Sequence, residues 1–124
     1  MYLIDSDILI NYLKNRKEAV VILNKMGDEE VGTSVICIAE VLEGLSDRRR
    51  VEFMEFLKTI RIYDVDLRIV GLFAVIRKGL RQVGKLIDNM DIMIAATCMA
   101  YDLILVTGNK KHFERIKGLE ILKI

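Results

Sequence analysis

Short apolar runs alternate along this chain with longer stretches whose apolar residues recur every three or four positions. The short runs are typical of buried strands, and the periodic stretches are typical of helices with one buried face. The runs predict strands over residues 2–4, 31–34, 60–65, 103–106 and 119–124. The periodic stretches predict helices over residues 6–13, 18–26, 35–45, 47–59, 66–80, 88–102 and 110–116.

Polar residues mark the ends of several of these helices. Ser6 and Ser34 stand directly before apolar periodic stretches, so we expect each hydroxyl to cap the helix that follows. Asp66 opens the long helix, and Asp102 ends the helix over 88–102. In the stretch 47–59 we expect one apolar face, formed by Val51, Met54, Phe56 and Leu57.

The alternation of strands and helices predicts the fold class. Apolar strands separated by helices indicate a mostly parallel sheet that is covered by helices on both faces. The chain has 124 residues, of which 52% are apolar and 30% charged, and this suits one folded domain over residues 1–124. We therefore expect an α/β fold, a single-domain α/β/α sandwich, in which ligands bind beyond the carboxyl ends of the strands.

Charge, hydropathy and cysteine use narrow the class of protein. The net charge is +1, so a surface for a polyanion has to be local. No run approaches the roughly 20 apolar residues of a membrane span, and the acidic start MYLIDSDILI is unlike a signal peptide. We therefore expect a cytoplasmic protein. Cys37 and Cys98 lack the spacing of redox or zinc motifs, and we interpret both as small buried residues.

Acidic residues lie where the predicted strands and helices meet. Asp5 follows the first strand, Asp7 lies at the start of the first helix, and Asn109 follows the strand over 103–106. Asp88 and Asp91 open a helix that is otherwise apolar. Acids at helix N-termini stabilise a helix by ~0.3–1 kcal/mol each. Capping or dipole interactions are therefore a sufficient alternative explanation for Asp7 and Asp88.

Glu40 needs a different explanation, because it lies in the middle of a helix among apolar residues. One alternative is a solvent-exposed stripe shared with Glu43, three residues on. If instead the first and fourth strands are neighbours, Asp5 and Asn109 emerge side by side. Asp91 and Glu40 then face the same edge. Carboxylates gathered in this way repel one another unless a cation joins them, and oxygen ligands favour Mg²⁺ or Mn²⁺.

Four segments resemble motifs of the PIN domain family, most closely the VapC-type toxins of prokaryotic toxin–antitoxin pairs. They are YLIDSDILI, SVICIAEVLEG, DIMIAAT and LVTGN, and they cover nearly the whole chain in the family's order. The resemblance implies a metal-dependent ribonuclease with three or four acidic site residues. By position, the acids that bind Mg²⁺ (or Mn²⁺) are Asp5, Glu40 and Asp91. Asn109 takes the place of a fourth catalytic residue, which is Asp in many members.

The departure at Asn109 removes one formal charge and puts the occupancy of a second metal in question. Asp7 stands where relatives often have Asn, so some charge is restored nearby. Ser6 and Thr107 match hydroxyl positions that line the family's site. We expect these three residues and Asp88 to support the metal ligands.

The hypothesis that follows is hydrolysis of RNA phosphodiesters with a metal-activated water. His112 is the single histidine, which excludes chemistry that needs two, and we expect it on an exposed turn of the last short helix. Lys110 and Lys111 follow the site loop, and we expect them to contact the RNA backbone. Arg77 and Arg81, four apart on one helix, are further candidates for RNA binding. The resemblance also implies a cognate antitoxin protein and a homodimer.

Two other functions fit parts of the pattern. A receiver domain that accepts a phosphoryl group on Asp64, with Thr107 and Lys110 as its hydroxyl and lysine, has a similar length and a parallel α/β fold. A receiver domain does not require an acid in the helix after the second strand, where Glu40 lies, or at the start of a buried helix, where Asp91 lies. A catalytically inactive PIN-like module that binds RNA or protein is the second alternative, and it is supported by Asn109.

Overall fold

The computed structural model describes residues 1–27 and 30–122 and confirms the predicted alternation of strands and helices. In chain order the elements are β1 (Tyr2–Ile4), α1 (Ser6–Leu13), α2 (Lys17–Met26), β2 (Val31–Ser34), α3 (Val35–Gly44), α4 (Asp47–Leu57), β3 (Arg61–Tyr63), α5 (Leu67–Gln82), α6 (Asn89–Tyr101), β4 (Ile104–Val106) and α7 (Lys110–Phe113).

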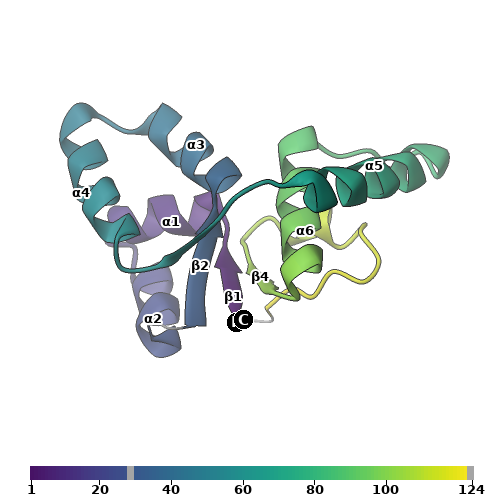
Figure 1. Cartoon of the computed structure of the whole chain (residues 1–124). Coiled ribbons are helices and arrows are strands. Elements are labelled where there is room, and N and C mark those ends of the chain that lie inside the picture. Colours follow the sequence, from purple (N-terminus) through teal and green to yellow (C-terminus); the bar gives the residue numbers. More distant parts are fainter. Residues whose placement is uncertain (28–29, 123–124) are drawn as a thin grey trace.

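The strands form one parallel sheet in the order β3-β2-β1-β4. The register pairs Leu3 of β1 with Gly32 of β2 on one side and with Leu105 of β4 on the other. Figure 1 shows α1 and α2 on one side of the sheet and α5 and α6 on the other. The chain therefore crosses one face after β1 and the opposite face before β4. This is the predicted α/β/α sandwich, and its topological switch point lies between β1 and β4.

Helix α6 is the buried centre of the second helical layer. Six of its 13 residues are fully buried, and they are Ile92, Ile94, Ala95, Ala96, Thr97 and Cys98. Helix α5 packs along α6 and covers it from outside. A helix that is apolar all round belongs in a core, because no face of it is suited to water. Within the described residues, no helix is long and apolar enough to span a lipid bilayer.

The helix ends confirm some of the predicted caps and correct others. Ser34 Oγ accepts from the Cys37 N–H at 3.1 Å, and Asp66 Oδ1 accepts from the Ile69 N–H at 3.0 Å, as expected for N-caps. The prediction that Ser6 caps α1 is wrong. Ser6 is already helical, and its N–H donates to Oδ1 of Asp5, which is the N-cap.

Two further caps concern α6. Asp88 occupies the N-cap position, but in the described structure its side chain makes no capping hydrogen bond. The capping explanation for Asp88 is therefore not supported. Asp102 ends the same helix, as predicted. It adopts the left-handed conformation, with φ of 56°, which is common at helix C-termini.

The predicted apolar face of α4 is only half right. Leu57 is buried and Phe56 packs against the ring of Tyr12, but Val51 and Met54 are 66% and 47% exposed. The helix instead turns Phe53 toward the core. Val51 precedes Phe53 by two residues, which is about 200° around the helix, and so it faces solvent.

The predicted last strand over 119–124 is reduced to a single parallel bridge between Leu105 and Ile121. Backbone hydrogen bonds flank this bridge at 2.8 Å, from the Leu105 N–H to Glu120 and from the Leu122 N–H to Leu105. Two such bonds hold the segment beside β4 without building a regular strand. Residues 123 and 124 of the prediction lie outside the described residues.

We predict that Gly32→Ala destabilises the sheet. A Cβ atom at this position would lie 2.6 Å from Cε2 of Tyr63 and 2.9 Å from the carbonyl oxygen of Arg61. Overpacking of this kind costs about 1–3 kcal/mol. Gly79→Ala in α5 is the matched control, because its Cβ would meet nothing within 4 Å. Urea unfolding of both variants measures the difference, and equal stabilities would contradict the packing argument.

Candidate metal-binding active site

The carboxyl ends of β1 and β4 are tied together by Asp5. Its backbone N–H donates to the carbonyl of Val106 at 2.9 Å, so the two strands stay paired to their ends. Thr107, directly after β4, donates from Oγ1 to Asp5 Oδ2 at 2.7 Å, across 102 positions of the chain. The same Oγ1 accepts from the N–H of Asn109 at 3.0 Å. Asp5 and Asn109 therefore emerge at one place, as the predicted pairing of the first and fourth strands requires.

The carboxylate of Asp5 is held in a poorly solvated position, with only 4% of the residue exposed. Burial raises the pKa of Asp5 to about 6, against the hydrogen bonds from Thr107 and Ser6, which lower it. The negative charges of Asp7 and Asp91 raise it further. A charged carboxylate here is costly unless a positive charge lies beside it.

Asp7 fixes the loop that follows β4. Its Oδ1 accepts from the Ile8 N–H at 2.8 Å, and its Oδ2 accepts from the Gly108 N–H at 2.9 Å. A Cβ atom on residue 108 would lie 2.8 Å from that Oδ2, so glycine permits the close approach. Burial raises the pKa of Asp7, and these backbone hydrogen bonds lower it. Asp7 thus contributes charge close to Asn109, while both of its oxygens are occupied by backbone donors.

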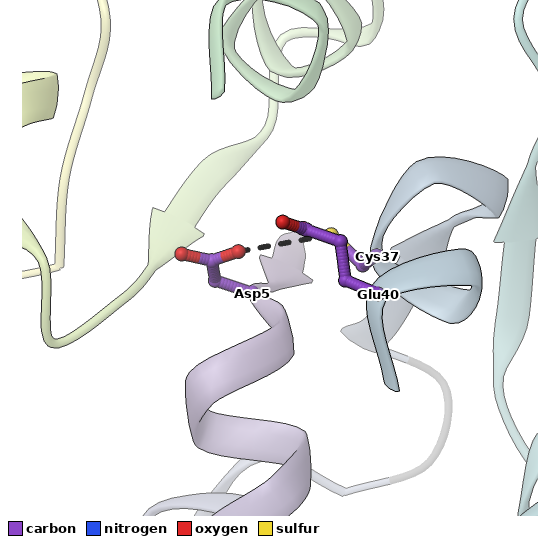
Figure 2. Close-up of side chains that lie close together, drawn as sticks. All are labelled: Asp5, Cys37 and Glu40. Carbon is purple, nitrogen blue, oxygen red and sulfur yellow. Dashed lines mark hydrogen bonds between the residues drawn. The ribbon is translucent and has the colours of Figure 1, made fainter. Parts of the chain in front are cut away.

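Helix α3 brings Glu40 and Cys37 to Asp5. The two residues are three positions apart, so they share one face of the helix. Asp5, Cys37 and Glu40 each offer one ligand atom, and these atoms all lie within 4.8 Å of one another. Figure 2 shows the carboxylate of Glu40 reaching toward that of Asp5. Glu43 is exposed whereas Glu40 is half-buried, which does not fit a solvent-exposed stripe shared by the two.

One oxygen of Glu40 is buried without compensation. Within the described part of the chain, Oε1 of Glu40 has no hydrogen-bond partner. Burial raises the pKa of Glu40, the hydroxyl of Ser6 lowers it, and the charges of Asp91, Asp88 and Asp7 raise it. A buried acceptor without a donor costs about 1–3 kcal/mol or more when charged. A cation is the natural partner for such an oxygen.

Asp91 faces the same group from the first turn of α6. Its charge raises the pKa of both Asp5 and Glu40, so Asp91 acts electrostatically on both carboxylates. It is not one of the three residues whose ligand atoms lie within 4.8 Å of one another. Burial raises the pKa of Asp91 itself, and the nearby His112 lowers it. Nδ1 of His112 lies 3.6 Å from Oδ2 of Asp91. Of the acids that sequence reasoning singled out, Asp5 after β1 and Glu40 of α3 thus lie together, and Asp91 of α6 acts on them through its charge.

The contact made by His112 was missed from the sequence. The residue is half-exposed on the short helix α7, as predicted, but its Nδ1 also lies 2.9 Å from Nδ2 of Asn109. The amide donates this hydrogen bond when the neutral ring carries its proton on Nε2. Asn109 is the N-cap of α7 and His112 follows three residues later, so this spacing was the available sequence signal.

Other predicted residues lie around this centre. Ser6 begins α1 beside Glu40, and Asp88 is exposed at the mouth of the site, where its charge acts on Glu40 and Asp91. Arg77 donates from Nε to Oδ1 of Asn89 at 2.9 Å, which brings it to the start of α6.

Three predicted basic residues differ in how close they come to the site. Lys110 and Lys111 begin α7 directly after Asn109, and Lys111 is exposed. Arg81 is exposed one turn beyond Arg77, and the structure does not join it to the acidic group.

The donor set fits a divalent cation. Carboxylate oxygens from separate elements converge, their pKa values are raised by burial, and one oxygen lacks a donor within the described structure. Asp5, Cys37 and Glu40 each offer a ligand atom within 4.8 Å of the others, and Asp91 adds a carboxylate whose charge acts on Asp5 and Glu40. Bound there, a cation would lie beside the carboxyl ends of β1 and β4, the edge where parallel α/β folds bind ligands.

Comparison with known proteins agrees with this geometry. The sequence model of one protein family, described as PIN domain, matches residues 2–119. Ribonuclease VapC1 of Methanocaldococcus jannaschii is 35% identical over 122 residues, which are 96% of this chain and 85% of the relative.

Solved structures share the fold. A chain in the crystal structure of VapBC2 from Rickettsia felis, bound to a DNA fragment from their promoter, has a TM-score of 0.89 at 26% identity, covering 98% of this chain and 96% of that one. A chain in a toxin-antitoxin complex from Klebsiella pneumoniae has a TM-score of 0.83 at 25% identity, with 100% of both chains covered. The match over residues 2–119 and the likeness to the archaeal ribonuclease show that this chain belongs to the PIN domain family, among its VapC-type members.

Proposed function

We propose that this chain is a divalent-metal-dependent endoribonuclease and the toxin of a toxin–antitoxin pair. The observation that carries the proposal is the meeting of Asp5 and Glu40 beside the carboxyl ends of β1 and β4, where a buried oxygen of Glu40 lacks a donor in the described structure. The charge of Asp91 acts on both of these carboxylates. The archaeal relative is named a ribonuclease, which supports the nuclease and leaves the receiver alternative without support.

Asp5, Glu40 and Asp91 are the proposed ligands of Mg²⁺ or Mn²⁺, since carboxylate oxygens suit these hard cations. The carbonyl oxygen of Asn109 is the proposed fourth contact, direct or through water. When bound, such a cation lowers the pKa of a coordinated water and offsets charge that develops on the phosphoryl oxygens. This chemistry requires no nucleophilic side chain from the protein.

The remaining residues of the site hold these groups in place. Thr107 and the N–H of Ser6 fix both oxygens of Asp5, and Asp7 anchors the loop that carries Asn109. His112 contacts the amide of Asn109 through Nδ1 at 2.9 Å, so it orients this proposed ligand. Groups positioned in advance lose less freedom when the substrate binds, which lowers the barrier to reaction.

The proposed RNA contacts lie around this edge of the sheet. Lys110 and Lys111 follow Asn109 directly, and Arg77 is joined to the start of α6 through Asn89. Arg81 lies one turn further along α5 and extends the same basic rim. Phosphates of the RNA backbone are the natural partners of such side chains.

An antitoxin and a second copy of the chain are the proposed protein partners. The likeness to a chain in the Klebsiella pneumoniae complex supports the antitoxin. Exposed apolar side chains supply surfaces for both partners. They are Val51 and Met54 on α4, and Val75 and Leu67 on α5.

Glu40→Gln and Asp91→Asn are each expected to lower RNA cleavage at least about 100-fold, because each variant removes a negatively charged ligand. Cleavage of a labelled RNA pool in Mg²⁺, and again in EDTA, measures the effect. Asp64→Asn is the matched control, since Asp64 is exposed after the edge strand β3. Full cleavage by both site variants, or cleavage that survives EDTA, would sink the proposal. An inactive wild-type chain that still binds RNA would favour the non-catalytic module.

Asp5→Asn is expected to abolish cleavage and, in the absence of metal, to stabilise the fold. Burial raises the pKa of Asp5 from 3.8 to about 6, so between these values the folded state binds more protons than the unfolded state. The charged carboxylate therefore costs stability as the pH rises through this window. At pH 7 in EDTA the variant should be more stable by roughly 2–3 kcal/mol, and the gain should fall below about 1 kcal/mol at pH 4.

Guanidinium unfolding at both pH values measures this gain. Added Mg²⁺ should stabilise the wild-type chain and leave Asp5→Asn nearly unchanged. A variant that is less stable than the wild type at pH 7 in EDTA would show that the hydrogen bonds of the carboxylate outweigh its burial.

Replacing Lys110 and Lys111 together by Gln is expected to weaken RNA binding and its salt dependence. Two lost phosphate contacts on a single strand should reduce the slope of log K against log salt by about 1.4. Binding is measured in the Asp91→Asn background, so that the RNA stays intact. The control replaces Lys17 and Lys25 of α2, which lies at the opposite end of the sheet (Figure 1). Equal slopes for the two double variants would remove Lys110 and Lys111 from the RNA surface.

A further inference from the structure

The thiol of Cys37 belongs to the same group of side chains as two of the proposed metal ligands. Cys37 is fully buried in α3, one turn before Glu40. Its Sγ lies 3.9 Å from Oδ1 of Asp5, a contact drawn as the dashed line in Figure 2, where Glu40 stands in front of the sulfur. Oxygen coordination of Mg²⁺ or Mn²⁺ gives this thiol no role.

Burial and the charge of Asp5 raise the pKa of the Cys37 thiol to about 12, so the free sulfur keeps its proton and a thiolate requires a bound cation. Two contacts of the sulfur suit that metal-bound form. The thiol donates toward Asp5, so its proton lies on the side where the ligand atoms converge. On the other side the hydroxyl of Ser34 donates to Sγ at 3.3 Å. A donor aimed at the sulfur stabilises the negative charge that a thiolate ligand carries.

The distances agree with one ion shared by sulfur and oxygen. Zinc lies about 2.3 Å from thiolate sulfur and about 2.0–2.2 Å from carboxylate oxygen. With these bond lengths, the separation of 3.9 Å between Cys37 Sγ and Asp5 Oδ1 corresponds to an angle of about 125° at the ion, near the tetrahedral value. Glu40 lies within 4.8 Å of both residues and is half-buried, so a small movement of its side chain supplies the third ligand.

We propose that Asp5, Cys37 and Glu40 form a binding site for a thiophilic divalent cation such as Zn²⁺, which inhibits the nuclease by occupying the carboxylates that Mg²⁺ requires. The inference rests on the proposed function, because the inhibited reaction is the metal-dependent cleavage. Binding breaks the S–H bond of Cys37 and forms a sulfur–metal bond. The proton leaves to solvent, and no electron is transferred.

Sulfur coordination decides which cations act in this way. Thiolate ligands favour Zn²⁺, Co²⁺ and Cd²⁺, whereas Mg²⁺ prefers oxygen ligands in octahedral geometry. Affinity for a given site also rises from Mn²⁺ through Co²⁺ toward the end of the first row. A small concentration of a thiophilic ion is therefore expected to outcompete a much larger concentration of Mg²⁺ at these side chains.

Cobalt titration of the metal-stripped full chain tests the proposal. Co²⁺ bound to thiolate gives a sulfur-to-metal charge-transfer absorption in the near ultraviolet, and Zn²⁺ should then abolish it by displacing the Co²⁺. We expect this absorption in the wild-type chain and in Cys98→Ala, whose cysteine is buried in α6 outside the group. We expect none in Cys37→Ser. In nuclease assays, Zn²⁺ should inhibit the wild type and Cys98→Ala alike.

A second variant keeps the test decisive if Cys37→Ser does not fold. Glu40→Gln retains the thiol, so it should keep the absorption while binding Co²⁺ at least about 10-fold more weakly. The proposal is overturned if the wild-type chain shows no charge-transfer absorption, if Cys37→Ser keeps it, or if Cys98→Ala loses it. Unchanged Co²⁺ affinity in Glu40→Gln would equally overturn the three-residue site.

The outcomes separate this inference from the proposed function. Mg²⁺-dependent cleavage without any thiolate absorption overturns the zinc site and leaves the nuclease intact. Thiolate absorption in a chain that cleaves no RNA in Mg²⁺ overturns the proposed nuclease and leaves the cation site.

Discussion

The parallel pairing of β1 with β4 is the contact on which the rest of this molecule depends. It joins the first strand to the fourth, and just beyond the pair Thr107 donates a hydrogen bond to Asp5 across 102 positions of the chain. The helices that follow β1 and the helices that precede β4 cover opposite faces of the sheet (Figure 1). A topological switch point therefore lies at the carboxyl ends of these two strands. Helix α6, which carries Asp91 in its first turn, lies on the second face directly before β4. One strand pairing thus determines both the layers of the fold and the place of the acids.

The site gathers charges that the fold alone does not favour. Asp5, Glu40 and Asp91 are each partly or wholly buried, and burial raises the pKa of all three. Natural proteins accept such a cost where function requires it. Asp5 also caps α1, so the same carboxylate follows a strand, begins a helix and belongs to the acidic group with Glu40. Because one carboxylate has several roles, an acidic residue can be present at position 5 even though we expect a neutral side chain there to give a more stable fold.

Much of the fold could be predicted because local chemistry and tertiary structure agree. The apolar runs at 2–4, 31–34 and 103–106 are strands, and Ser34 and Asp66 begin helices as hydroxyl and carboxylate caps. The positions of Asp5 and Asp91 followed from strand and helix ends. Cys37 and His112 could not be placed in this way, since a lone thiol and a lone imidazole carry no periodic pattern. Val51 was misplaced because α4 offers more than one apolar face, and only packing decides between them.

The tie between Thr107 and Asp5 also has a consequence during protein synthesis. A nascent chain leaves the ribosome with its amino end first. Asp5 and Glu40 therefore emerge long before the segment that holds Thr107, Asn109 and His112. Until that last segment has left the exit tunnel, β1 lacks its neighbour and the acids lack the frame that orients them. A nascent chain therefore lacks the hydrogen bond that orients Asp5 and the contacts of Asn109, and the acidic group is completed only after residues 107–112 have emerged.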